Sequence, residues 1–356
     1  MATDSLRGES LAAARPSRAA QFFEMWARRV VTVPAYLLLC VTVVGSLPLL
    51  LGVAAIADLL RGGPWPLVRA VTFFAFYLAC ESLGIIASVI IWLSGGTWLG
   101  IPREQYLDRN VALQECWAVT LFRGVQRIFG LRAEVEEVGD VGRGPVIVFI
   151  RHASVGDTLL PAVLLSKRYG LRLRYVLKRE LLWDPCLDIV GNRLPNYFVR
   201  RGSDDGEREI AAMQELMENL GPRDGVLIYP EGTRFTPAKR ARILQRLETS
   251  ESRELFEAAR GLRHVLPPRL GGALGLLERN TGAAAVFCAH VGFEGTTSFN
   301  ELLNGSLVRQ VIRVRLWRVP FEEIPTERAA RAAWLFAQWQ RIDEWIETTT
   351  TATHRG

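Results

Sequence analysis

The sequence predicts an α/β domain with a mostly parallel sheet flanked by helices, preceded by an N-terminal two-helix membrane hairpin. Three observations lead to this prediction. Two long apolar runs lie in the first third of the 356-residue chain. Short β-rich segments then alternate with helical patterns, which is typical of a parallel sheet. Two of these segments lead into glycine-containing loops with charged and hydroxyl side chains, as expected where the strands of such a sheet end.

The membrane hairpin is predicted from the two apolar runs. Residues 30–57 include no charged side chain over 28 positions, and about 20 apolar residues suffice for a helix to cross a bilayer core. Residues 70–101 contain one charged residue, Glu81, which is expected to snorkel, to pair across the hairpin or to be protonated. The turn-forming connection DLLRGGPWPLVR joins the runs, and Pro34 and Pro48 predict a kink or a break in the first run.

Basic residues predict the orientation of this hairpin. Only Arg61 and Arg69 lie in the connection. Five arginines precede the first run: Arg7, Arg15, Arg18, Arg28 and Arg29. The positive-inside rule therefore places the N-terminus, and everything after the hairpin, on the cytoplasmic side. A shallow hairpin that dips into one leaflet gives the same sidedness. A signal peptide is disfavoured because the first run is too long for an h-region.

Three regions follow from this pattern. We expect a disordered basic N-terminus at residues 1–28, a membrane helical hairpin at 29–102 and a cytoplasmic domain at 103–356. The location would be the cytoplasmic or inner membrane, with the domain facing the cytoplasm.

Composition narrows the class of partner without fixing it. Hydrophobic residues make up 49% of the chain, the formal net charge is +6 and the pI is near 9.3. Such a surface can meet nucleic acid, anionic lipid head groups or phosphorylated substrates. Nucleic acid is the remote alternative, because no dense basic stripe with interleaved aromatic residues occurs. The five cysteines lack CxxC spacing, so neither a disulfide framework nor a zinc site is expected, and a reducing compartment is favoured.

From about residue 103 onward, the pattern is that of one soluble domain. Six β-rich segments are strand candidates: PVIVFI (145–150), LRLRYVL (171–177), YFV (197–199), GVLIY (225–229), AAVFCAHV (284–291) and QVIRVRLWRV (310–319). Helical patterns occupy residues 158–168, 205–220 and 326–348, and Asp157 is the expected cap of the first.

His152 and Asp157 follow the first of these strands. On a regular helix a separation of five residues turns two side chains about 140° apart, so they meet only if a loop lies between them. A carboxylate bonded to one imidazole nitrogen fixes the tautomer and raises the basicity of the other nitrogen. Such a pair can take a proton from a hydroxyl that attacks a carbonyl. Taken alone, so short a pattern is more often a helix N-cap at Asp157 beside an ordinary loop histidine.

A second loop strengthens the catalytic interpretation. The stretch LIYPEGTRFTPAKR also leaves a strand and enters a loop with an acid, a hydroxyl and a guanidinium. Arg234 offers a planar fork that matches phosphate, and Thr233 and the loop amides can add neutral donors. Alone, this stretch fits equally well a turn in which Glu231 and Arg234 form a surface ion pair. Its occurrence with the histidine loop, behind a membrane hairpin, is hard to assign to chance.

These residues resemble the glycerolipid acyltransferases of the lysophosphatidate acyltransferase type. HASVGD matches the HxxxxD motif of that family, and YPEGTRF matches its phosphate-binding motif. The block LKRELLWDPCLDIVGNRLPNYFVRRG is similar to the family's intervening block, with four residues on matching positions: Lys178, Glu180, Gly191 and Arg201. VLPPRLGGALGLL resembles a Pro-Arg-x-x-Gly stretch of a membrane-anchored branch. The blocks occur in family order and cover about residues 145–277.

The resemblance implies roles for individual residues. His152 would be the general base and Asp157 its orienting partner. Contacts to the acceptor, with the phosphate on the arginine, would come from four residues of the second motif: Glu231, Gly232, Thr233 and Arg234. Positive charge at the head group would come from Arg201, helped by Arg200, and from Lys178. The small residues after His152 and the charge of Arg200 depart from many family members, and both concern substrate choice.

The resemblance also implies an activity. The chain would be an O-acyltransferase that moves a fatty acyl group from acyl-CoA or acyl-carrier protein to the free hydroxyl of 1-acyl-glycerol-3-phosphate, which yields phosphatidic acid. Its partners would be membrane lipids, the lysophospholipid acceptor and the thioester donor. No cofactor or metal is expected, because a thioester is already activated. No nucleic-acid partner is expected either. The alternatives are another lysophospholipid or glycerol phosphate as acceptor, and a non-catalytic anionic-lipid binding protein on the same scaffold.

Overall fold

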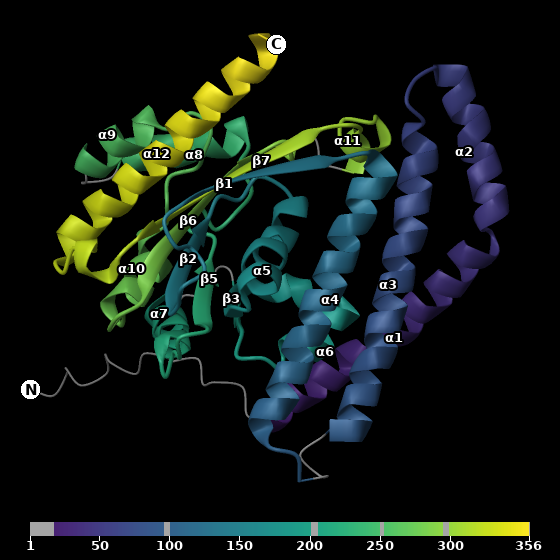
Figure 1. The fold of residues 1–356 in the computed structure, drawn as a ribbon, viewed down its shortest axis with the longest axis horizontal. Helices are drawn as coiled ribbons and strands as arrows, with labels where there is room; N and C mark the ends of the chain where they lie inside the picture. The colour runs from purple at the N-terminus through teal and green to yellow at the C-terminus, as the bar shows by residue number, and fades with distance from the viewer. Residues whose placement is uncertain (1–17, 96–99, 201–205, 250–252, 295–298, 356) are drawn as a thin grey trace, which may run out of the picture.

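A seven-stranded β-sheet lies at the centre of the fold (Figure 1). The computed structural model describes residues 18–95, 100–200, 206–249, 253–294 and 299–355. The strands are β1 (Arg132–Val138), β2 (Val146–Ile150), β3 (Arg172–Lys178), β4 (Tyr197–Val199), β5 (Asp224–Ile228), β6 (Ala284–Val291) and β7 (Val311–Val319). Their order is β1-β7-β6-β2-β5-β3-β4, and all neighbours are parallel except β6 and β7. The predicted α/β class is therefore confirmed.

The strand sequences explain the positions of the strands in the sheet. Every residue of β2, β5 and β6 is buried, as expected for strands covered by helices on both faces. All six predicted strands are present. The sequence does not predict β1, because RAEVEEV is polar. This strand lies at the edge of the sheet, where Glu134 and Glu136 pair with Arg313 and Arg315 of β7.

Helices cover both faces of the sheet (Figure 1). One face is covered by α7 (Gly206–Gln214), α8 (Pro237–Glu248), α9 (Arg253–Gly261), α10 (Leu270–Glu278) and α12 (Arg328–Arg355). The other face is covered by α4 (Arg103–Phe129) and by residues 156–169, which end in the short α5 (Lys167–Tyr169). A regular helix is expected at 158–168, but 3-10 and π turns form there instead. Pro161 lies inside this segment and lacks the amide that a regular helix needs.

The described part of the chain begins with helices α1 (Arg18–Gly45), α2 (Leu47–Arg61) and α3 (Pro66–Gly95), which precede α4. The first apolar run breaks at Ser46, with Pro48 at the start of α2, as predicted. Helix α3 packs against both α1 and α2, so a hairpin forms in which one arm is bent (Figure 1). At the turn, the carboxylate of Asp58 accepts hydrogen bonds from the amides of Leu67 at 3.2 Å and Val68 at 3.0 Å.

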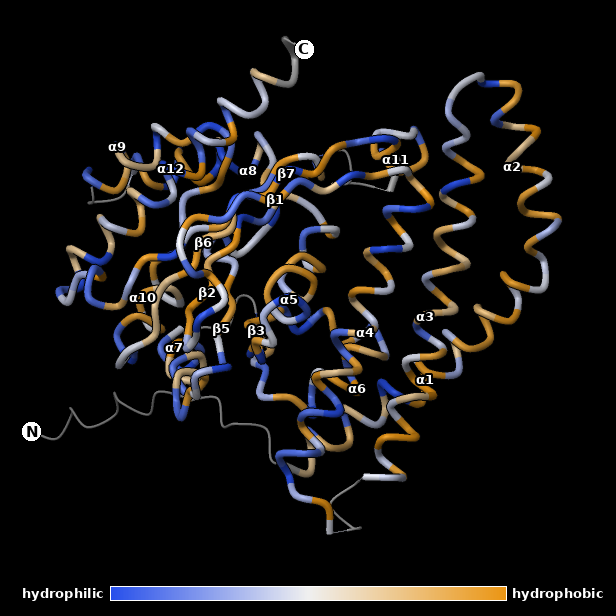
Figure 2. The backbone as a smooth tube through the Cα atoms, viewed as in Figure 1, coloured by the Kyte–Doolittle hydropathy of each residue, from blue (hydrophilic) through white to orange (hydrophobic). Residues whose placement is uncertain are grey.

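The outer surface of these three helices is apolar, and their traces are mostly hydrophobic in Figure 2. Val41, Leu49 and Leu60 are 71%, 70% and 84% exposed. The segments Ala19–Gly45 and Pro66–Gly95 are long and apolar enough to cross a membrane, judged by length and composition. Large exposed apolar surfaces mark interaction sites, and these helices indicate membrane association. The boundaries of the hairpin, and whether it spans the bilayer or dips into one leaflet, stay predictions.

Polar contacts attach the N-terminal helices to the rest of the chain. Asp188, in α6 (Pro185–Gly191), is fully buried and pairs with Arg28 at 2.6 Å and with Arg29 at 2.8 Å. Glu81 of α3 is also fully buried, and its Oε1 accepts a hydrogen bond from the indole of Trp117 on α4 at 2.9 Å. Glu81 therefore contacts α4. The short helix α11 (Phe299–Leu303) also contacts α3.

Candidate active site

The ends of four parallel strands carry the predicted site residues. His152 follows β2, Glu231 follows β5, Lys178 ends β3 and Arg200 follows β4. Because these strands are parallel and adjacent in the order β2-β5-β3-β4, their carboxyl ends meet at one edge of the sheet. Neighbouring strands lie about 4.8 Å apart, so the ends of β2 and β3 are roughly 10 Å apart.

His152 and Asp157 meet as the sequence predicts. Nδ1 of His152 lies 3.1 Å from Oδ1 and 3.3 Å from Oδ2 of Asp157. A loop and a short 3-10 turn at Gly156–Leu159 bring the two side chains together. Asp157 is fully buried and His152 is 7% exposed, so water has little access to the pair. Nδ1–H donates to the carboxylate, which leaves Nε2 as the proton acceptor.

The Asp157 carboxylate is held in its ionised form. The backbone amides of Ala153 and Ser154 donate to Oδ2 at 2.7 Å and 2.8 Å. Burial raises the pKa of Asp157, but the hydrogen bond from His152 and the nearby imidazoles outweigh burial, so the pKa lies below its usual range. An ionised Asp157 fixes the tautomer of His152 and stabilises the imidazolium that forms when Nε2 takes a proton.

A second imidazole lies behind the pair. His290 on β6 is fully buried, and its Nε2 lies 3.6 Å from Oδ2 of Asp157. The same nitrogen donates to the carbonyl oxygen of Arg151 at 3.0 Å. Burial lowers the pKa of His290, which keeps this imidazole neutral near pH 7. His290 is adjacent to the site only because β6 lies next to β2 in the sheet, so local sequence carries no signal for this contact.

The loop after β5 holds the backbone of His152 on both sides. Oε1 of Glu231 accepts a hydrogen bond from the His152 amide at 2.9 Å, and the amide of Phe235 donates to the His152 carbonyl at 2.9 Å. The ring of Tyr229 packs against the imidazole, with centroids 4.8 Å apart. The two loops that carry the sequence motifs are therefore in direct contact.

Glu231 is fully buried between two backbone segments. Its Oε2 accepts a hydrogen bond from the amide of Leu266 at 3.0 Å. Burial raises the pKa of Glu231 to about 8. With both oxygens bound to amides, this side chain positions the backbone of His152, and its predicted contact to the acceptor stays a prediction.

Gly232 is required by the shape of this loop. Its φ is +65°, in the left-handed region that favours glycine, and a Cβ there would lie 3.0 Å from Cδ of Arg269. The amide of Arg269 donates to the carbonyl of Pro230 at 2.8 Å. The Pro-Arg stretch that the sequence singles out therefore lies across the loop and shapes it.

Thr233 and Arg234 are half-buried and share a partner in α8. Nζ of Lys239 donates to Oγ1 of Thr233 and to the carbonyl of Arg234, both at 3.0 Å. Thr236 caps α8 by accepting from the Lys239 amide at 3.2 Å. Lys239 is thus a second cation beside Arg234 that the motif pattern does not identify. Acceptor contacts by Gly232, Thr233 and Arg234 stay predictions.

The remaining predicted cations lie farther along the same edge. Lys178 pairs in register with Val199, the last residue of β4, and the exposed Arg200 follows directly. Arg201 lies outside the described residues. The head-group roles of all three cations stay predictions.

A carboxylate on α12 binds the backbone segment that contacts Glu231. Asp343 is buried and accepts hydrogen bonds from three consecutive backbone amides: Arg263 at 3.0 Å, His264 at 2.6 Å and Val265 at 3.1 Å. The next amide, that of Leu266, is the one that binds Glu231. A continuous chain of contacts therefore runs from Asp343 through this segment to Glu231 and His152.

Arg151 fixes the same segment from the sheet. It is 2% exposed, and its guanidinium donates to Oε1 of Glu294 at 2.7 Å and to the carbonyl of His264 at 3.1 Å. Within the described part of the chain, no group of three or more His, Cys, Asp or Glu side chains is placed to hold a metal ion.

The fold and the site define an α/β protein with a histidine–aspartate pair at the carboxyl edge of a parallel sheet, beside a glycine-containing basic loop. Residues 132–289 match the family model described as Acyltransferase. This segment is therefore similar to acyltransferases, which supports the resemblance that the sequence indicates.

Curated relatives of this chain are named 1-acyl-sn-glycerol-3-phosphate acyltransferases. The chain is 25% identical over 213 residues to mouse 1-acyl-sn-glycerol-3-phosphate acyltransferase epsilon, which covers 56% of each chain. It is 26% identical over 214 residues to the human delta form, covering 58% of this chain and 53% of the relative. The chain thus spans about half the length of these relatives. Among solved structures, it is similar to the 1-acyl-sn-glycerophosphate (LPA) acyltransferase of Thermotoga maritima, with 16% identity, a TM-score of 0.48, and coverage of 83% of this chain and 98% of that chain.

Proposed function

We propose that the chain transfers a fatty acyl group from an acyl thioester to the free hydroxyl of 1-acyl-glycerol-3-phosphate, which yields phosphatidic acid. The single observation that carries the proposal is the buried His152–Asp157 pair, with Nδ1 and Oδ1 3.1 Å apart. A protein that only binds lipid has no need of an oriented base. The names of the relatives support lysophosphatidate as the acceptor.

His152 acts as the general base. The hydroxyl of the acceptor is too weak an acid to ionise near pH 7, so Nε2 takes its proton as the oxygen attacks the thioester carbonyl. The new C–O bond forms, the C–S bond breaks, and the proton passes from Nε2 to the departing sulfur. Asp157 holds Nδ1–H throughout and stabilises the imidazolium. General-base help of this kind contributes about 10²–10⁴ in rate.

The cations along the strand ends bind the phosphate of the acceptor. Arg234 lies on the loop that contacts the backbone of His152, and Lys239 adds a second positive charge there. Lys178 extends the positive edge toward β4. A phosphate monoester carries up to two negative charges, and charge-assisted hydrogen bonds from such groups are stronger than neutral ones.

The apolar helices keep this chemistry at the membrane. The acyl chains of the lipid remain in the bilayer, and the polar reacting groups reach the edge of the sheet. The excess of arginine before the first apolar run favours a domain that faces the cytoplasm. The donor is a coenzyme A or carrier-protein thioester.

The test is product analysis with the purified full-length protein in lipid nanodiscs. Acyl-CoA and acyl-carrier protein are each supplied with lysophosphatidate, other lysophospholipids and glycerol 3-phosphate, and products are identified by mass spectrometry. We expect phosphatidic acid from lysophosphatidate, and a loss of about 10²–10⁴ in kcat for His152→Ala. Product from another acceptor alone would replace the proposed substrate. Absence of product with every acceptor, or unchanged turnover in His152→Ala, would remove the enzymatic function.

A further inference from the structure

A cavity of about 580 Å³ lies between α1 and the strand ends beside the site. Its lining includes Glu24 and Arg28 of α1, Arg179 and Trp183 from the turn after β3, and Arg200 after β4. Arg179 directly follows Lys178 in sequence, so the cavity adjoins the edge that carries the predicted phosphate-binding cations.

The guanidinium groups of the cavity differ in their availability. Arg28 is bound to the buried Asp188 and forms part of the wall. Arg200 is exposed, and its guanidinium has no partner among the residues that the structure describes. Arg179 pairs with Glu24, whose side chain is 51% exposed. The Arg179 side chain is 28% exposed and the pair is open to solvent on the Glu24 side, so a phosphate monoester, with up to two negative charges, can compete with Glu24 for Arg179. Arg179 and Arg200 thus offer two guanidinium groups to an anion in one cavity, whose lining also includes the carboxylates of Glu24 and Glu180.

Aromatic residues place the cavity at the level of the lipid head groups. Phe22, Phe23 and Trp26 of α1 are 55%, 71% and 48% exposed, and Trp183 in the cavity wall is 61% exposed. Exposed aromatic side chains beside an apolar helix are typical of the membrane–water interface. The uncharged run begins at Val30, about one turn further along α1. The cavity therefore opens where a phospholipid presents its phosphate.

We propose that this cavity is the port through which the phosphate monoester of a membrane lysophospholipid enters the site, held by Arg179 and Arg200. This role rests on the proposed function and names the route of its acceptor. The acyl chain stays beside the apolar part of α1, and the phosphate moves along the strand ends from Arg200 and Arg179 toward Lys178. Coenzyme A also carries a phosphate monoester, so the experiment separates the lipid from the soluble donor.

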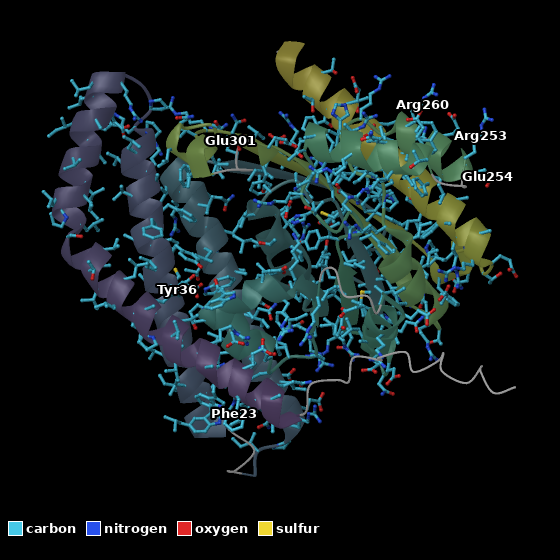
Figure 3. The ribbon with its side chains drawn as sticks, turned by 180° about the vertical axis from the view of Figure 1, so that it is seen from behind. Phe23, Tyr36, Arg253, Glu254, Arg260 and Glu301 are labelled. Atoms are coloured by element: carbon cyan, nitrogen blue, oxygen red, sulfur yellow. The ribbon has the colours of Figure 1, made fainter. Side chains whose placement is uncertain are left out.

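The experiment compares full-length wild type with Arg179→Gln, Arg200→Gln and the double variant. The matched control is Arg253→Gln, an exposed arginine on α9, which Figure 3 shows at the other end of the molecule from Phe23. Two readouts are used. The first is the KM for lysophosphatidate in vesicles and for acyl-CoA in solution. The second is binding of the protein in nanodiscs to lysophosphatidate and to coenzyme A, which requires no turnover.

We expect the double variant to raise the KM for lysophosphatidate about tenfold, with kcat within twofold of wild type, because the lost contacts act before the chemical step. Its affinity for lysophosphatidate should fall to a similar extent, and Arg253→Gln should match wild type. The proposed port is wrong if the double variant keeps the wild-type KM and affinity for lysophosphatidate. It is also wrong if the double variant loses affinity for coenzyme A alone. If wild type forms no product at all, the proposed function fails, and a loss of lysophosphatidate binding in the double variant would still assign the cavity to the lipid.

Discussion

Oε1 of the buried Glu231 accepts a hydrogen bond from the backbone amide of His152 at 2.9 Å. Its other oxygen holds the amide of Leu266, which belongs to the segment fixed by Asp343. Glu231 therefore connects His152, the proposed base, to the C-terminal helix. A residue that the motif assigns to substrate binding sits where it can set the position of the base, and kinetics can distinguish the two roles.

Glu231→Gln is the first test of this role. A glutamine has one acceptor oxygen, so the amide of His152 or of Leu266 loses its partner, at a cost of roughly 1–3 kcal/mol in unfolding free energy. We expect kcat to fall at least about tenfold while the KM for lysophosphatidate stays within twofold. Steady-state kinetics and thermal unfolding check this. A raised KM at unchanged kcat would instead support a direct contact between Glu231 and the acceptor.

The pH dependence of stability provides a second test of the same residue. Burial raises the pKa of Glu231 to about 8, from an ordinary value of 4.5. Between these values the folded protein holds a proton that the unfolded chain has released, so the free energy of unfolding decreases as pH rises. The Tm of wild type should therefore fall more between pH 6 and pH 8.5 than the Tm of Glu231→Gln, because the variant lacks the titrating group. Parallel curves for the two proteins would contradict this.

Asp157→Asn should remove most of the activity while the chain stays folded. An asparagine cannot carry the negative charge that orients Nδ1–H and stabilises the imidazolium, and we expect kcat to fall about 10²–10⁴-fold. Asp140→Asn, at an exposed position after β1, is the matched control and should match wild type. Acyl transfer assays check both variants. Retained turnover in Asp157→Asn would show that His152 needs no carboxylate.

Asp343 is predicted to be a positioning residue. In Asp343→Asn one oxygen becomes a donor that faces backbone amides, so the segment that contacts Glu231 shifts. We expect kcat to fall about tenfold with little change in KM, and the unfolding free energy to fall by roughly 1–3 kcal/mol. Glu347→Gln on the same helix, which contacts the side chain of His264 at the surface, is the control. A purely structural role would leave kcat of the folded protein unchanged.

Asp188 is predicted to hold the N-terminal helices in place. Asp188→Ala leaves Arg28 and Arg29 without their buried partner, which costs roughly 3 kcal/mol. We expect a protease to cleave α1 of this variant faster than α1 of wild type, while the rest of the chain stays folded. Limited digestion in nanodiscs measures this rate. Asp140→Ala is the control. Equal digestion of both variants would show that packing of α1 against α3 is sufficient.

Much of the fold follows from local sequence, and the exceptions have physical reasons. Runs of buried Val, Ile, Leu and Phe identify β2, β5 and β6, whereas β1 is stabilised by ion pairs to β7 that become visible only once the sheet is formed. The break at Ser46 follows from Pro48. The irregular turns after Asp157 were not predictable from periodicity, because the hydrophobic pattern there is the same as that of a regular helix.

In the candidate site, too, some contacts follow from local sequence and others form only in the assembled fold. His152 and Asp157 are five residues apart, so their contact can be predicted from a turn between them. His290 and Asp343 join the site from distant parts of the sequence, His290 through its neighbouring strand and Asp343 through α12.

 Each of these contacts depends on which elements the completed fold places side by side: His290 reaches Arg151 across 139 positions, and Asp343 reaches His264 across 79. Sequence motifs predict the residues that act on the substrate, and the assembled sheet identifies the residues that contact and position them.

Helix α4 lies between the sheet and α3, and Asp188 ties α1 to the same body. Among the described residues, the domain thus contacts its apolar helices through packed surfaces. If these helices lie in the membrane, the packing fixes the distance between His152 and the bilayer. Under the proposed function, we expect acceptors whose hydroxyl lies at another depth in the bilayer to react slowly, however well their phosphate is bound.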